Sequence, residues 1–156
     1  MLGTMRILAL LVVAFGFAGV TGCASPVATP LASPTGPLVT VETRGGECAA
    51  GPCGQTITID RDGRVHLAAK PPNELGQLTP DVLRNLERLI ATTDFGAIKS
   101  HPFTGECPTA YDGQETIYTF SAPGGVETIA SCTVVVDPSL PLFAALDAVV
   151  SAAGRP

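Results

Sequence analysis

The chain has 156 residues, of which 46% are hydrophobic and only 15% are charged, and its formal net charge is −5. We expect no nucleic-acid partner, because such binding depends on neutralising phosphates with lysine and arginine clusters and the sequence has none. The length suits one ordinary domain, and acidity of this size usually serves solubility.

Residues 1–22 are typical of a secretory signal peptide. Arg6 is their only charged residue, and the uncharged run Ile7–Val20 follows it before two small residues. An uncleaved transmembrane helix is the alternative, since a membrane span needs about 20 apolar residues. The glycines in the run disfavour that alternative. Cleavage would leave a net charge of −6, because the segment contains one arginine and no acidic residue.

Val20-Thr21-Gly22-Cys23 closes this segment and resembles the lipobox of bacterial lipoproteins, in which an aliphatic and two small residues precede an obligatory cysteine. The resemblance implies that Cys23 receives a diacylglyceryl group by thioether linkage and becomes the N-terminus, whose amine is then open to acylation, for example with palmitate. Two acyl chains anchor a protein far more firmly than one. We therefore expect a lipid-anchored protein on the cell membrane, facing outside the cytoplasm.

The number of cysteines favours this assignment. The chain has five, and an exported protein with an odd number needs a reason for the unpaired one. Lipidation of Cys23 supplies that reason. In the alternative, the general signal peptidase cuts a secreted protein and Cys23 is incidental.

Ala24–Pro37 contains four prolines and no charged or aromatic residue. This composition favours extended backbone and cannot bury enough apolar surface to fold. We expect residues 23–37 to form a tether, which reaches roughly 40 Å at ~3.1 Å per residue. Serine and threonine among the prolines also permit O-glycosylation. Lipobox, tether and composition together resemble the small lipoproteins of actinobacteria.

Residues 38–156 are expected to form a single extracytoplasmic domain. Leu38–Arg44 alternates apolar and polar residues, which indicates a strand. Residues 55–69 alternate on either side of Asp62-Gly63, which indicates a hairpin. The pattern of Pro80–Thr93 predicts a helix, with Thr79 as N-cap and Leu78 and Leu83 at the spacing of a hydrophobic staple. Its expected apolar stripe consists of Val82, Leu83, Leu86, Leu89 and Ile90.

A second hairpin is expected to join Glu115–Ser121 to Val126–Val136, and a second helix to run from Ser139 or Leu140 to Gly154. The order of elements predicts an α+β fold: an antiparallel sheet of two hairpins plus an N-terminal strand, with two helices packed on one face. We expect two disulfides to complete this fold.

Four cysteines remain after Cys23, and they allow three pairings in an oxidising compartment. The Gly51-Pro52 turn favours a bridge between the cysteines on either side of it, which leaves the last two to each other. The favoured pairs are Cys48 with Cys53 and Cys107 with Cys132. A Cys₄ zinc site and a redox-active pair are the alternatives, but the spacings fit neither.

Residues able to carry chemistry are scarce. The two histidines, His66 and His101, accompany no recognisable nucleophile motif, and neither a phosphate-binding nor a dinucleotide-binding glycine motif occurs. Asp60-Arg61-Asp62-Gly63 has some features of a calcium loop but lacks the closing glutamate, so a hairpin turn is expected there. We therefore expect no enzyme activity, no catalytic residue, no metal and no cofactor; a hydrolase with unrecognised catalytic residues is the alternative.

One segment suggests a more specific activity. Cys107-Pro108-Thr109-Ala110-Tyr111-Asp112 resembles the reactive-site loop of the Streptomyces subtilisin-inhibitor family. The resemblance implies a membrane-tethered serine-protease inhibitor with Thr109 at P1 and Ala110 at P1′, held extended by Pro108 and a disulfide. The alternative is a plain loop that leads into a strand. The favoured function is a binding or interaction module of the cell envelope, whose partner is an envelope protein or a small ligand.

Overall fold

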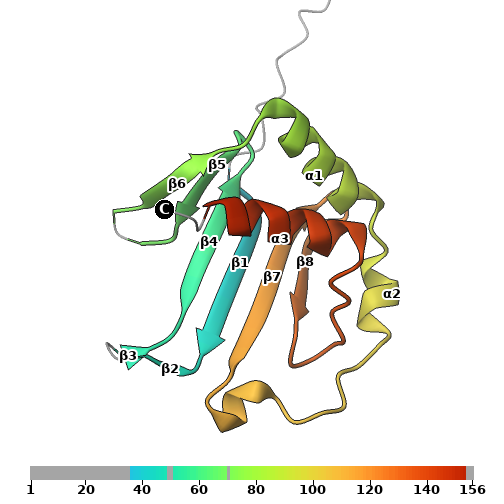
Figure 1. Ribbon diagram of the computed structural model, residues 1–156. Coiled ribbons are helices and arrows are strands. Elements are labelled where there is room, and N and C mark those ends of the chain that lie inside the picture. The colour runs from blue at the N-terminus through green and yellow to red at the C-terminus, as the bar shows by residue number, and fades with distance from the viewer. Residues whose placement is uncertain (1–35, 49–50, 70, 154–156) are drawn as a thin grey trace, which may run out of the picture. The chain divides into compact units, whose positions relative to one another are not determined.

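The computed structural model describes residues 36–48, 51–69 and 71–153 of the chain. They form a six-stranded antiparallel sheet in the order β6-β5-β4-β1-β7-β8 (Figure 1). Its strands are β1 (Pro37–Gly45), β4 (Gln55–Asp60), β5 (Arg64–Leu67), β6 (Asn73–Gln77), β7 (Gln114–Ala122) and β8 (Gly125–Ala130). Two short strands, β2 (Glu47–Cys48) and β3 (Gly51–Pro52), form a separate ribbon. The expected signal peptide, Cys23 and most of the expected tether lie outside the described residues.

Strand β1 lies in the middle of the sheet and pairs antiparallel with β4 and β7, the first strand of each hairpin. The register aligns Val39 with Ile59 on one side and with Phe120 on the other. Side chains directly opposite each other in an antiparallel pair share a face. Apolar residues from all three strands therefore meet on the same face of the sheet.

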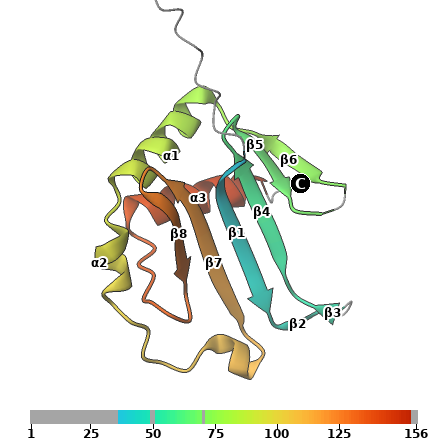
Figure 2. The same cartoon turned by 180° about the vertical axis from the view of Figure 1, so that it is seen from behind.

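Helices α1 (Pro80–Thr92) and α3 (Pro141–Ala153) cover that face, and the short helix α2 (Phe95–Lys99) lies beside β8. Figure 2 shows the opposite face, which no described helix crosses. The sequence produces this arrangement because most apolar residues of the two hairpins lie on one side of their strands; Ile117 and Val126 lie on the other side. Aromatic rings from both layers meet, with 5.0 Å between the centroids of Tyr118 and Phe143. The fully buried core side chains are Leu38, Val39, Ile59, Val65, Leu86, Phe120, Ile129, Leu142 and Leu146.

The start of α1 shows how local sequence sets an element boundary. The hydroxyl of Thr79 accepts a hydrogen bond from the backbone N–H of Val82, and a proline occupies the first helical turn. These features satisfy an exposed donor and fix φ where the helix begins. The helix therefore starts where the sequence predicts.

The α+β fold, the antiparallel sheet and both disulfides agree with the prediction. Cys48 is bonded to Cys53 and Cys107 to Cys132. The first bridge closes the β2–β3 ribbon, and the second ties the segment before β7 to the end of β8. No helix among the described residues combines the length and the apolar character that a bilayer span requires.

Several details differ from the expectation. Strand β6 and helix α2 were not predicted, and β8 ends at Ala130 rather than at Val136. The second helix begins at Pro141, and its last described residue is Ala153. Val82 was expected in the buried stripe but is 41% exposed, because it lies at the edge of the face that α1 turns toward the sheet.

Candidate functional site

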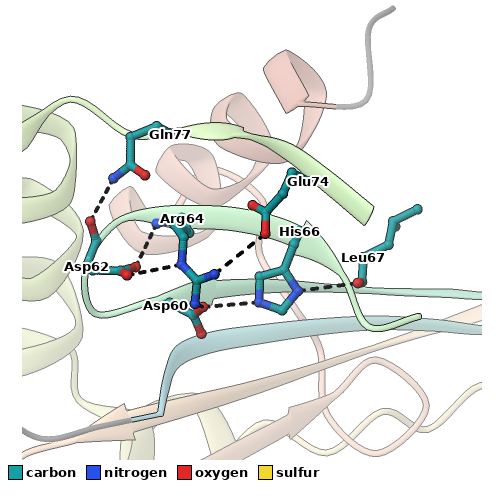
Figure 3. Close-up of polar contacts among 7 residues, drawn as sticks. All are labelled: Asp60, Asp62, Arg64, His66, Leu67, Glu74 and Gln77. Atoms are coloured by element: carbon teal, nitrogen blue, oxygen red, sulfur yellow. Dashed lines mark hydrogen bonds and ion pairs between the residues drawn. The ribbon is translucent and has the colours of Figure 1, made fainter. Parts of the chain in front are cut away.

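A network of charged side chains occupies the face of β4, β5 and β6 opposite the helices (Figure 3). Arg64 lies at its centre, where its Nε donates to Asp62 Oδ2 at 3.0 Å and its Nη2 donates to Asp60 Oδ2 at 2.9 Å. Its Nη1 also lies 3.6 Å from Glu74 Oε1. The hydrogen bonds from the Arg64 backbone and side chain lower the pKa of Asp62. This network joins three neighbouring strands.

His66 belongs to the same network. Its Nε2 lies 3.1 Å from Asp60 Oδ2, and its Nδ1 lies 3.3 Å from the carbonyl oxygen of Leu67. A general base needs a ring nitrogen directed at the proton it removes. Both nitrogens of His66 face acceptors instead, although Thr58 lies opposite His66 in the strand register. The arrangement connects the strands rather than pairing a base with a hydroxyl.

The described residues also lack a metal-binding arrangement: no group of three or more histidine, cysteine, aspartate or glutamate side chains is placed to hold an ion. The carboxylates around Arg64 are bonded to that guanidinium group and to His66, which accounts for their charge without a metal.

The segment expected to form an inhibitor loop is exposed but not extended. Residues Pro108–Tyr111 form a 3₁₀ helix, which corrects the expectation of an extended backbone there. The turn is closed by a 2.8 Å hydrogen bond from Gly113 N to Pro108 O, with Asp112 in the left-handed region at φ 64°. The Cys107–Cys132 bridge anchors this turn to the sheet.

Within this turn the predicted P1 residue does not protrude freely. The Thr109 hydroxyl donates to the bridged Cys107 Sγ at 3.1 Å. Its methyl group packs so closely on Gly45 that a Cβ at that position would lie only 2.7 Å from it. Tyr111, in contrast, is 71% exposed, and its hydroxyl donates to Glu106. Thr109 and Tyr111 are both exposed, but the contacts of Thr109 with Gly45 and Cys107 tie it to the turn.

A third feature is a hollow of about 650 Å³ beside α2, here called the α2 hollow. Its walls come from the end of α1, from α2, from residues 135–140 and from the start of α3. Four buried side chains, supplied by all three helices, form its floor: Leu89, Ile98, Leu142 and Phe143. Val135, which is 53% exposed, lies in the wall.

Polar groups of the α2 hollow come from Asp94, His101 and Asp137, with hydroxyls from the last turn of α1. Asp94 is the N-cap of α2, and its Oδ1 accepts from Ala97 N at 2.8 Å. Asp137 Oδ1 accepts from the hydroxyl and the backbone N–H of Ser139, at 2.7 and 2.8 Å. These hydrogen bonds lower the pKa of Asp137, so its carboxylate is ionised at neutral pH.

A second hollow, of about 620 Å³, lies at the other end of α1 and α3 and is here called the β6 hollow. Its walls are the first turns of α1, the last turns of α3 and strand β6. Ala145, Ala148 and Ala152 form much of the α3 wall. Asp81 is its only charged lining residue, and that carboxylate accepts a hydrogen bond from Arg84.

Sequence reasoning identified His101 but did not place it beside Asp94 and Asp137. Asp94 directly precedes α2, so an N-cap pattern could have found it, whereas Asp137 caps a turn at Ser139, before α3 begins at Pro141. Nothing in the sequence shows that the two caps border one hollow, because that depends on how α2 packs against the start of α3. Comparison of the sequence with models of known families and with curated proteins gives no match.

Proposed function

We propose that this chain is a lipid-anchored binding protein of the cell envelope, attached through Cys23, whose folded part takes up an apolar ligand in the α2 hollow. The observation that carries the binding function is the hollow itself. Its volume of about 650 Å³ falls within the range of roughly 300–1,000 Å³ typical of ligand sites, and its floor is apolar with a few polar groups around it.

The pattern of disulfides supports the anchor. All four cysteines of the described part of the chain are bonded to each other in two pairs, which leaves none of them to pair with Cys23. Stable disulfides also belong to an oxidising compartment. Lipidation explains why an exported protein carries a cysteine at residue 23 that has no cysteine partner.

Two measurements test the proposal separately. Labelled fatty acid should enter the native chain and should not enter a Cys23→Ala variant, and equal labelling of both would rule out the anchor. Decanol should shift the methyl NMR signals of Leu89, Ile98, Val135 and Leu142 in the exported chain carrying Cys23→Ala. Unchanged signals with every apolar probe would rule out binding in the hollow.

Protease inhibition by residues 107–112 is a second candidate, favoured by the exposure of the turn and its anchorage by the Cys107–Cys132 bridge. Rigid loops lose less entropy when they bind. A protease would, however, have to open the 3₁₀ turn and lift Thr109 away from Gly45. Inhibition of a subtilisin-like protease that is abolished by Thr109→Pro would support this candidate, and inactivity of Thr109→Met and Thr109→Lys variants would remove it.

A further inference from the structure

We infer that the α2 hollow selects ligands that join a positively charged group to an apolar body, such as an alkyl amine. This inference rests on the proposed function, because it names the chemical class of ligand for the same hollow. It follows from the charges around the hollow, from the partners of those charges and from the apolar floor below them.

The floor can accommodate only an apolar body. Leu142 and Phe143, at the start of α3, are 2% and 4% exposed, and Ile98 of α2 is 8% exposed. These side chains carry no polar atom, so a polar group seated on them would lose its hydrogen bonds to water without replacement. Val135 extends the apolar surface to the outside of the hollow.

The rim carries negative charge without a compensating cation. Asp94, His101 and Asp137 are the only ionisable side chains in the lining, which contains neither lysine nor arginine. Two cations on the helices that border the hollow have partners outside it: Lys99 of α2 pairs with Glu127, and Arg88 of α1 donates to the side chain of Asn85. Among the described residues, no lysine or arginine forms an ion pair with either aspartate.

Each aspartate also keeps one oxygen for a ligand. Both use Oδ1 to cap a backbone turn, as described above, and in the described part of the chain neither Oδ2 accepts a hydrogen bond. The caps fix the two carboxylates before any ligand arrives. An ammonium N–H therefore meets acceptors that need no reordering, which lowers the entropy cost of binding.

The same charges disfavour an anionic ligand. A carboxylate headgroup would face two like charges, whereas an alcohol could donate one hydrogen bond but would lack the attraction between opposite charges. Two solvent-exposed ion pairs change affinity by about tenfold in total at most. We expect decylammonium to bind up to about tenfold more tightly than decanol, and decanoate to bind more weakly than either.

The test compares these three probes, which share one alkyl chain, by titration against the exported chain carrying Cys23→Ala. This chain keeps every residue of the folded part and has no acyl group that could occupy the hollow itself. Binding is followed by the methyl signals of Ile98 and Val135.

Two charge-removing variants complete the test. Asparagine at Asp94 or Asp137 retains a side-chain oxygen for the cap while removing the charge. The double variant Asp94→Asn, Asp137→Asn should lose the preference for decylammonium and should bind decanol as before. Asp81→Asn at the rim of the β6 hollow is the matched control and should keep the preference.

The outcomes separate the two proposals. Equal binding of all three probes would overturn the inference while the proposed binding function stands. Unchanged cation preference in the double variant would also overturn it, because the preference would then come from elsewhere. Absence of binding by any probe would overturn both, and recovery of the native chain with its own acyl chain in the hollow would replace the inferred ligand by that lipid.

Discussion

The two hollows of this protein lie at opposite ends of the same helix pair and have nearly equal volumes, about 650 and 620 Å³. The α2 hollow has a floor of large buried side chains and two carboxylates that no described cation neutralises. The β6 hollow is lined by alanines of α3, and its one carboxylate is bonded to Arg84. Volume alone therefore does not identify a binding site, because the chemistry of the walls differs.

The largest expected effect is on stability, and it compares a buried side chain of each hollow. Phe143 packs edge-on against Tyr118 at 5.0 Å between ring centroids and is almost completely buried, so Phe143→Ala should lower the free energy of unfolding by about 3–5 kcal/mol. Val149→Ala in the β6 hollow should lower it by only about 2 kcal/mol, at ~0.8 kcal/mol per buried CH₂ group plus a small cavity. Guanidinium unfolding measures both losses. Equal losses would contradict the claim that the α2 hollow rests on larger buried side chains than the β6 hollow.

The Cys107–Cys132 bridge should matter to the α2 hollow, since Cys132 lies three residues before Val135, where the wall segment begins. Replacing both cysteines by serine should lower the free energy of unfolding by about 3–4 kcal/mol, given the sequence separation of 25. The amide of Val135, bonded to the carbonyl of His101, should also exchange faster.

The Cys48–Cys53 bridge is the matched control, because it closes a separation of only 5 residues far from the hollow. Its removal should lower the free energy of unfolding by about 2 kcal/mol and should leave the exchange of Val135 unchanged. Equal effects of the two double variants on Val135 would show that the wall does not depend on the nearer bridge.

A smaller effect is expected at the rim of the β6 hollow. Thr79→Ala removes the side-chain cap of α1 and should lower the free energy of unfolding by about 1 kcal/mol, whereas Thr79→Ser should retain most of it. Decylammonium binding in the α2 hollow should not change. A loss of binding with Thr79→Ala would mean that the two hollows are not independent.

The smallest effect is a dependence on pH. Hydrogen bonds from Ser139 lower the pKa of Asp137 in the folded state, so its carboxylate stabilises the fold above the pKa of the unfolded chain. This contribution is lost as the pH falls through the lower, folded pKa. The Tm difference between the native chain and Asp137→Asn should therefore be constant near neutral pH and shrink below about pH 4. A Tm difference that grows in acid would contradict a lowered pKa of Asp137 in the folded state.

The elements that sequence reasoning found are those with a long repeating pattern. Helix α1 shows several turns of apolar spacing and a capped start, and both hairpins alternate around turn residues. Strand β6 was missed because Asn73–Gln77 has one apolar residue, Leu75, and follows two prolines. Its place in the sheet comes instead from pairing with β5 and from the contact between Arg64 and Glu74.

The candidate site was harder to predict because it depends on packing between segments that lie far apart in the sequence. Helix α2 has five residues, too few for a period to appear, and the burial of Phe95 and Ile98 holds it in place. The 3₁₀ turn at residues 108–111 was missed for a related reason. Cys107-Pro108 favours extended backbone, whereas the hydrogen bond to Gly113 and the packing of Thr109 on Gly45 close the turn.

The most direct test of the account is to block each hollow in turn. Ala97 of α2 and Ala148 of α3 are both exposed and line the α2 and β6 hollows, respectively. In the exported chain carrying Cys23→Ala, Ala97→Phe should weaken decylammonium binding at least about tenfold, and Ala148→Phe should leave it unchanged. Unchanged binding in Ala97→Phe, or a loss only in Ala148→Phe, would contradict the claim that the α2 hollow is the binding site.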